Sequence, residues 1–360
     1  MDRYTHGGNL YKASRETGGA AFLDFSANIN PLGLSPVVRS ALQTALEAVV
    51  HYPDPDATAL REALLVRYGM PAESLVLGNG AAELFYLVCL VRRPAHVYIC
   101  PPAFSEYERA ARAAGAVVHF VPLQKGNYAV DWPALQRVLV PDSLVFLGHP
   151  NNPTGNLLEL AALDTFLAAT ENQRCLVAVD ESFLDFIDLN GQSSCLAWVR
   201  RYPQLIAIRS LTKIFAIPGL RLGFGVMAPD LAVALDAAKD QWNVNVLAQT
   251  AGVAALRDAQ YLQDTQAAVP RWRQQLLSGL AAFPTITVTP SVVNFLLLDM
   301  NQTGQTASWW RQAFFAHHIL IRDCSNYVAL SPGHIRIAVR TEAENSQFLH
   351  ALHAIMEELS

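Results

Sequence analysis

The segment that decides the fold and the chemistry runs from residue 210 to 221 and reads Ser210-Leu211-Thr212-Lys213-Ile214-Phe215-Ala216-Ile217-Pro218-Gly219-Leu220-Arg221. Lys213 has apolar neighbours here. Burial disfavours the charged ammonium, so such a lysine becomes an amine nucleophile for Schiff-base chemistry. The alternative is a lysine whose charge reaches solvent along a buried stem. Ser210 and Arg221 stand on either side of the amine, and a hydroxyl with a guanidinium suits a phosphate dianion.

Short apolar runs around this segment predict a sheet. They are rich in Val, Ile and Leu and cover residues 75–77, 95–100, 117–123, 144–147, 175–179 and 205–208. Helical patterns separate several of them, at 81–91, 159–170 and 230–239. Near-continuous apolar runs are typical of strands buried on both faces. We therefore expect an α/β protein with a mostly parallel sheet flanked by helices.

Polar side chains stand at or just after the ends of three runs, namely Asn152, Asp180 and Ser210. Each alone is more often a cap or turn group. Ligands of open parallel sheets, however, bind outside the carboxyl ends of the strands, so the combination points to a site. The Asp180 carboxylate needs a cation or hydrogen bonds. A pyridinium N–H would meet that need, and Asn152 could donate to a ring hydroxyl.

Two weaker signals accompany these residues. Gly78-Asn79-Gly80 precedes the helical stretch at Ala81 and offers free backbone N–H groups to a phosphate. Most glycine turns of this kind are only helix entries. Phe104 follows a pair of prolines and could stack on a ring, or could equally be a core aromatic.

The composition excludes several classes of protein. A hydrophobic fraction of 52% with only 16% charged residues excludes a disordered chain. The net charge of −5 gives no electrostatic reason to bind nucleic acid. Five cysteines without a C-x-x-C pair argue against a disulfide framework and a zinc site, so we expect no metal. Residues 84–91 are too short to span a membrane, and the N-terminus lacks the apolar core of a secretory signal. We expect a cytoplasmic protein.

The pattern changes after about residue 250. A helical pattern over roughly 246–280 precedes short apolar runs at 286–288, 294–298, 319–321 and 335–339. We expect three parts. They are an N-terminal arm over 1–45 that packs with the small domain, a large domain over 46–245, and a smaller α+β domain over 246–360.

One constellation resembles a known cofactor site. Asn152-Pro153-Thr154-Gly155, Asp180, and Ser210-x-x-Lys213 with Arg221 are similar in order and spacing to the pyridoxal-phosphate site of the fold type I aminotransferase family. The resemblance implies that Lys213 forms the internal aldimine, that Asp180 pairs with the pyridine nitrogen, and that Asn152 contacts the ring hydroxyl. It also implies the groups that hold the cofactor phosphate, which are Ser210, Arg221 and the backbone of Gly80 and Ala81.

A narrower resemblance extends from about residue 5 to beyond 340. It is carried by His6-Gly7-Gly8-Asn9, Ser26-Ala27-Asn28-Ile29-Asn30-Pro31, Tyr52-Pro53-Asp54, Ile321-Arg322-Asp323-Cys324 and Arg336-Ile337-Ala338-Val339-Arg340. These stretches resemble the threonine-phosphate decarboxylases of cobalamin biosynthesis. Histidinol-phosphate aminotransferases share much of the remainder.

This resemblance implies decarboxylation of L-threonine O-3-phosphate to (R)-1-aminopropan-2-ol O-2-phosphate. By it, Arg336 clamps the substrate carboxylate with help from Asn152. The substrate phosphate would meet His6, the Gly7 backbone, Asn28 and Arg322. Tyr52 would reach the cofactor phosphate of the neighbouring subunit, which implies a homodimer.

Two alternatives remain open. The first is a histidinol-phosphate-type aminotransferase with a keto-acid acceptor, which uses nearly all the same residues. Phe183 stands where aminotransferases commonly have tyrosine, which favours decarboxylation. The second is a pyridoxal-phosphate-sensing transcription regulator, which the early start of the motifs at residue 6 and the acidic charge disfavour.

Overall fold

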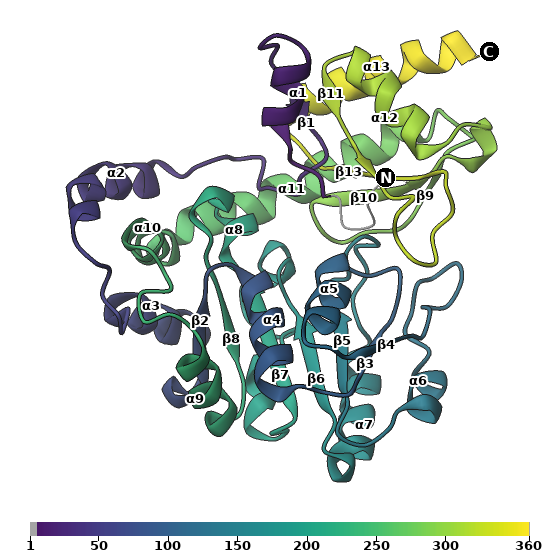
Figure 1. Ribbon diagram of the computed structural model, residues 1–360. Helices are drawn as coiled ribbons and strands as arrows, with labels where there is room; N and C mark the ends of the chain where they lie inside the picture. Colours follow the sequence, from purple (N-terminus) through teal and green to yellow (C-terminus); the bar gives the residue numbers. More distant parts are fainter. Residues whose placement is uncertain (1–5, 360) are drawn as a thin grey trace.

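A seven-stranded sheet forms the centre of the large domain in the computed structural model, which describes residues 6–359 (Figure 1). Residues 1–5 of the expected arm and residue 360 lie outside the described residues. The strand order is β2-β8-β7-β6-β5-β3-β4, and only β8 runs antiparallel to its neighbours. The strands are β2 (Leu75–Gly78), β3 (His96–Ile99), β4 (Val117–Phe120), β5 (Leu144–Gly148), β6 (Leu176–Asp180), β7 (Leu205–Ser210) and β8 (Gly223–Val226).

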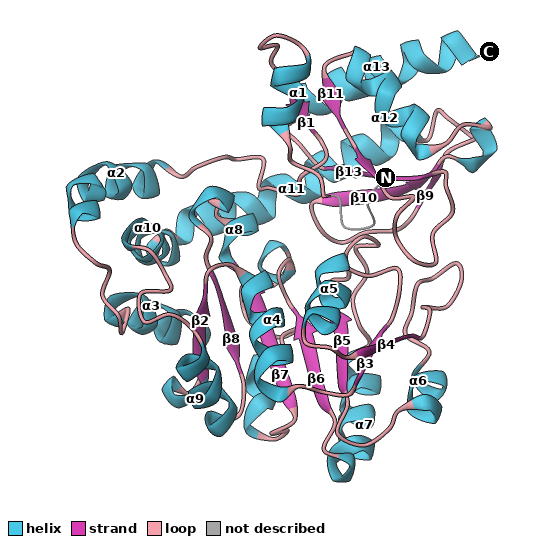
Figure 2. Cartoon of the chain, in the orientation of Figure 1, coloured by secondary structure: helices cyan, strands magenta, loops and turns pink. Residues whose placement is uncertain are grey.

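Helices cover both faces of this sheet (Figure 2). Side chains alternate along a strand, so in β5 Val145 and Leu147 enter one core while Leu144 and Phe146 enter the other. The second core is completed by α4 (Ala81–Arg92), α5 (Ser105–Ala113) and α9 (Pro229–Ala238). The first is completed by α2 (Pro36–Ala45), α3 (Thr58–Tyr68), α6 (Trp132–Val138), α7 (Leu160–Thr170) and α10 (Val246–Arg257). The expected α/β fold with a mostly parallel sheet is confirmed.

The small domain has an antiparallel sheet in the order β12-β13-β10-β9. Its strands are β9 (Thr287–Val288), β10 (Phe295–Asp299), β12 (Arg322–Asp323) and β13 (His334–Ala338). Its core is filled from α12 (Ala307–Ala316), α13 (Glu342–Leu359) and the second half of α11 (Ala259–Leu280). The arm begins with α1 (Leu10–Glu16) and then pairs β1 (Leu23–Asp24) with β11 (Ile319–Leu320).

Two details differ from the sequence-based expectation. The helical pattern over 246–280 is two helices, because the Asp258 side chain caps α11 by accepting a hydrogen bond from the Tyr261 N–H. Strand β8 was not expected, since its sequence Gly-Phe-Gly-Val has a weak strand signal. Within residues 6–359, no helix combines the length and apolar character needed to cross a membrane.

The division into three parts stays a prediction. Helix α10 packs on α2 and α3, and Tyr261, Leu262 and Val269 of α11 also belong to a large-domain core. Trp272 and Leu276, further along the same helix, belong to the small-domain core. Helix α11 is therefore a single helix that contributes to the cores of both domains.

Candidate active site

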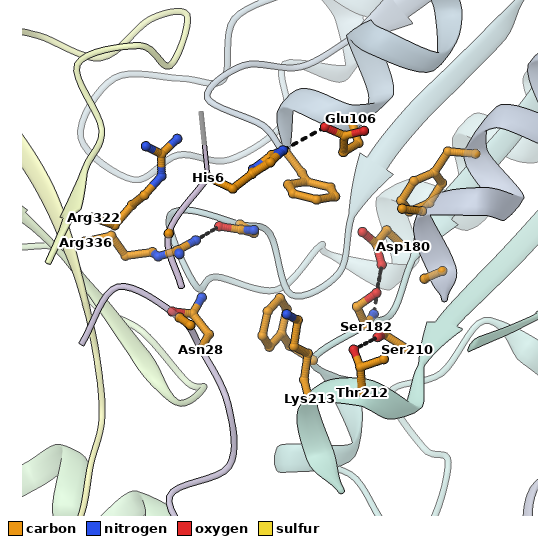
Figure 3. Close-up of a pocket in the computed structure, with 18 of the residues that line it drawn as sticks. His6, Asn28, Glu106, Asp180, Ser182, Ser210, Thr212, Lys213, Arg322 and Arg336 are labelled. Carbon is orange, nitrogen blue, oxygen red and sulfur yellow. Dashed lines mark hydrogen bonds and ion pairs between the residues drawn. The ribbon is translucent and has the colours of Figure 1, made fainter. Parts of the chain in front are cut away.

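A cavity of about 420 Å³ lies at the carboxyl ends of the parallel strands, where the two domains and the arm meet (Figure 3). It gathers most of the residues that the sequence singled out. These are His6, Gly7, Asn28, Ala81, Phe104, Asn152, Asp180, Ser210, Lys213, Arg221, Arg322 and Arg336. These residues lie far apart in the sequence, and the fold brings them together.

Lys213 lies on the one-turn helix α8 (Leu211–Ile214), which begins where β7 ends. In Figure 3 its side chain points into the cavity, with Asp180 and Ser210 on one side and Arg336 on the other. Burial, followed by the charges of Arg336 and Arg221, lowers the pKa of Lys213 to about 8. The amine is therefore much easier to deprotonate than an ordinary lysine, as a Schiff-base nucleophile requires.

This shift predicts a pH-dependent stability of the cofactor-free protein. Below pH 8 the folded state must carry a buried ammonium, at a cost of about 3 kcal/mol for a pKa drop from 10.5 to about 8. Between these pH values the unfolded chain binds a proton that the folded chain does not, so stability rises with pH. Lys213→Met should therefore be more stable than wild type at pH 7, and the gap should close by about pH 10.5. Urea unfolding of both proteins at several pH values measures this difference in stability. A difference that does not change with pH would contradict the prediction.

Asp180 ends β6 and is held on both oxygens. The Ser182 hydroxyl donates to Oδ1 at 2.5 Å, and the Tyr107 hydroxyl donates to Oδ2 at 2.6 Å. Burial raises the pKa of Asp180, and these hydrogen bonds partly offset that rise. A carboxylate fixed at the cavity wall is suited to accept a hydrogen bond from a protonated ring nitrogen.

A phosphate cradle lies at the start of α4. A Cβ added to Gly80 would sit 2.3 Å from a guanidinium nitrogen of Arg221, so only glycine lets this side chain lie against the turn. The first N–H groups of α4 have no side-chain cap and are free for an anion. Ser210 and Thr212 share a hydrogen bond of 2.6 Å beside them, and both line the cavity. The donor set fits the phosphate of the cofactor.

Two buried arginines face the cavity from the small domain. Arg336 of β13 donates to Asn152 and, at 3.1 Å, to the Ser26 carbonyl. Arg322 of β12 donates to the Asp323 carbonyl at 2.7 Å and to Asn326 at 3.0 Å. They are 6% and 2% exposed, and within residues 6–359 neither forms a salt bridge with a carboxylate. Buried charges are normally paired, so these guanidinium groups indicate anionic ligands.

Two expected residues lie outside this cavity lining. Gly80 lies behind Arg221, as described above. Tyr52 is 76% exposed and stacks on Trp242 with ring centroids 4.2 Å apart. Its expected contact involves a neighbouring subunit and stays a prediction.

The structure also adds residues that sequence reasoning missed. Glu106, Ser182, Thr212 and Tyr327 line the cavity, and Tyr107 supports Asp180 from behind. Ser182 and Thr212 lie within two residues of Asp180 and Ser210, so their proximity was a usable signal. Glu106 and Tyr107 carried no such signal, because the packing of α5 brings them to the site.

The fold and the site together define a pyridoxal-phosphate-dependent enzyme of the aminotransferase fold. Lys213, Asp180 and the phosphate cradle present the three kinds of group that this cofactor needs. The chain belongs to the aminotransferase class I and II family, whose model matches residues 20–352.

Known proteins of two activities are similar to the chain. It is 34% identical to threonine-phosphate decarboxylase of Salmonella typhimurium, over 98% of this chain and 96% of that protein. It is 33% identical to histidinol-phosphate aminotransferase 1 of Nitrosococcus oceani, over 99% and 94%. The crystal structure of L-threonine-O-3-phosphate decarboxylase from Porphyromonas gingivalis has a TM-score of 0.80 and 26% identity, covering 93% of this chain and 99% of that one.

A longer relative matches as well. The chain is 34% identical to the adenosylcobalamin biosynthesis bifunctional protein CobDQ of Leptospira interrogans and spans 41% of its length. The resemblance to threonine-phosphate decarboxylases is thus confirmed, and histidinol-phosphate aminotransferases are similar to the chain at nearly the same sequence identity.

Proposed function

We propose that the protein decarboxylates L-threonine O-3-phosphate to (R)-1-aminopropan-2-ol O-2-phosphate in cobalamin biosynthesis. The observation that carries this proposal is a pair of buried guanidinium groups, Arg322 and Arg336, that have no carboxylate partner in the described part of the chain. They call for two anionic groups on one ligand. Threonine phosphate has both, a carboxylate and a phosphate dianion.

Further residues support two anion subsites. Arg336, with Asn152, is placed to bind the carboxylate. His6, Arg322 and Asn28 line the same end of the cavity as a phosphate subsite, and Figure 3 places their side chains away from Asp180 and Ser210. Asn28 lines the cavity, and its amide Nδ2 group is the part of the side chain that can donate a hydrogen bond to a phosphate oxygen.

Each group has a part in the chemistry. When bound, pyridoxal phosphate supplies a conjugated ring that accepts the electron pair released at Cα. Arg336 orients the carboxylate so that the bond from Cα to the carboxyl carbon is the one that breaks, which is catalysis by orientation. Carbon dioxide leaves, and the Lys213 ammonium delivers a proton to Cα.

The second candidate is a histidinol-phosphate-type aminotransferase, which the relatives favour equally. Histidinol phosphate has no carboxylate and would leave one guanidinium unpaired, although a dicarboxylic keto-acid acceptor would satisfy both. Phe183 is buried against Phe295 and offers no hydroxyl to the cofactor ring. This absence favours decarboxylation over transamination.

One assay separates the two candidates. The purified enzyme with pyridoxal phosphate is given L-threonine phosphate without a keto acid, and carbon dioxide and aminopropanol phosphate are measured. A parallel reaction contains histidinol phosphate with 2-oxoglutarate, and glutamate is measured. We expect carbon dioxide in the first and no glutamate in the second. Glutamate without carbon dioxide would replace the proposal with the aminotransferase.

We also propose a homodimer in which Tyr52 reaches the partner's site. Tyr52 lies on a surface with exposed apolar neighbours, Leu46, Val49 and Val50, which are 54%, 54% and 76% exposed. Apolar surface of this kind marks interaction sites in proteins. Sedimentation as a monomer at micromolar concentration would contradict this arrangement.

A further inference from the structure

The Asp180 carboxylate is held by a residue that lies outside the cavity lining. Tyr107, on α5, donates its hydroxyl to Oδ2 at 2.6 Å, on the other side of the carboxylate from Ser182. Its ring is 1% exposed and lies nearly parallel to Phe146 at 5.1 Å and edge-on to Phe85 at 4.9 Å. This packing fixes the direction of the hydroxyl.

Nothing in the mechanism above uses this hydroxyl. A buried tyrosine usually donates to a backbone carbonyl, as Tyr98 does to Val138 at 2.7 Å. Tyr107 instead donates to the carboxylate at the cofactor end of the cavity. Burial and the charge of Asp180 raise the pKa of Tyr107 well above its usual value, so the phenol stays a proton donor.

We propose that Tyr107 is a positioning residue that orients Asp180 toward the ring nitrogen of the cofactor and holds its charge in place. A hydrogen bond to a carboxylate withdraws electron density from it and restrains its rotation. Tyr107 and Ser182 together fix the plane of the Asp180 carboxyl group before the cofactor arrives. The inference rests on the proposed contact between Asp180 and the ring nitrogen, and it is independent of which substrate is used.

The test is Tyr107→Phe, which removes the hydroxyl and keeps the packed ring. We expect the cofactor dissociation constant to rise about 10-fold or more, because a hydrogen bond to a charged group is lost. The pH dependence of the bound cofactor's absorption spectrum should also change. Tyr98→Phe is the matched control, since it removes a buried tyrosine hydroxyl of β3 that lies outside the cavity lining. It should bind the cofactor within about 2-fold of wild type.

A cofactor analogue separates positioning from folding. In 1-deazapyridoxal phosphate the ring nitrogen is replaced by C–H, so Asp180 has no nitrogen to contact. Wild type and Tyr107→Phe should bind this analogue equally. A defect that persists with the analogue would mean that Tyr107 only stabilises the fold, and the proposal would be overturned. If wild type binds the analogue as tightly as pyridoxal phosphate, the Asp180 contact fails and the inference fails with it.

A failure of the proposed decarboxylation would appear in the carbon dioxide and glutamate assay and not in the measurement of cofactor binding. Cofactor binding is measured without substrate, so it reports on Tyr107 and Asp180 whether the enzyme releases carbon dioxide or forms glutamate.

Discussion

Lys213→Ala should lower turnover by more than about 10⁴-fold, the largest loss expected of any single substitution in this protein. In the proposed mechanism, the substitution removes both the amine that would bind the cofactor covalently and the group that would carry a proton to Cα. General acid–base catalysis alone accounts for about 10²–10⁴-fold, and loss of the covalent attachment adds to it. Among the described residues that line the cavity, Lys213 is the one lysine, so no neighbouring amine can take its place.

The measurement combines turnover with mass spectrometry of borohydride-reduced protein, which reports covalently bound cofactor. Wild type should gain the mass of the reduced cofactor, and the variant should not. Lys239→Ala is the control, because Lys239 binds the Leu77 carbonyl at 2.8 Å and Asp236 at 2.7 Å outside the cavity lining. Covalent cofactor in the Lys213 variant would show that the nucleophile is a different residue.

Arg336→Gln should produce the second-largest loss. Truncating one partner of a buried, hydrogen-bonded charge pair costs about 2–5 kcal/mol, which corresponds to about 30-fold to 5,000-fold in kcat/KM. The loss has two parts. The substrate carboxylate would lose its proposed partner, and Asn152 would lose the hydrogen bond that it accepts from Arg336.

A matched control lies four residues further along the chain. Arg340 pairs with Glu344 at 2.8 Å and is not part of the cavity lining, so Arg340→Gln should keep kcat/KM within a few-fold of wild type. Substrates that lack the carboxylate give the sharper readout. For aminopropanol phosphate as an inhibitor, Arg336→Gln should bind about as well as wild type. An equal loss for this ligand would remove Arg336 from carboxylate binding.

The sequence was sufficient for the residues that follow strands. Lys213 and Asp180 end or follow apolar runs, and a parallel sheet brings such ends to one edge. The local sequence at the strand ends was therefore enough to predict that Lys213 and Asp180 lie at the same edge of the sheet. The arm and the small domain were harder, and His6, Arg322 and Arg336 were placed by resemblance.

Other features depend on tertiary packing that no local pattern records. Tyr107 reaches Asp180 because α5 packs on α4, β3 and β4 and because its ring stacks on Phe146 of β5, whereas its local sequence is that of an ordinary amphipathic helix. Strand β8 pairs on both sides although its glycines disfavour strand structure, so its neighbours decide its conformation. The single cap at Asp258 ends one helix and starts another within a continuous apolar pattern.

The cavity is assembled from residues that span positions 6 to 336, and this distribution bears on how the protein folds. Contacts between residues so distant in sequence form slowly, because a long loop must close before they stabilise the chain. The binding site is therefore complete only when the large-domain core, the small-domain core and the arm have all docked. A ligand that binds only this final state shifts the folding equilibrium toward it by mass action. A substrate bound against His6, Asn28, Arg322 and Arg336 would contact both the arm and the small domain, so its binding should stabilise their docking on the large domain.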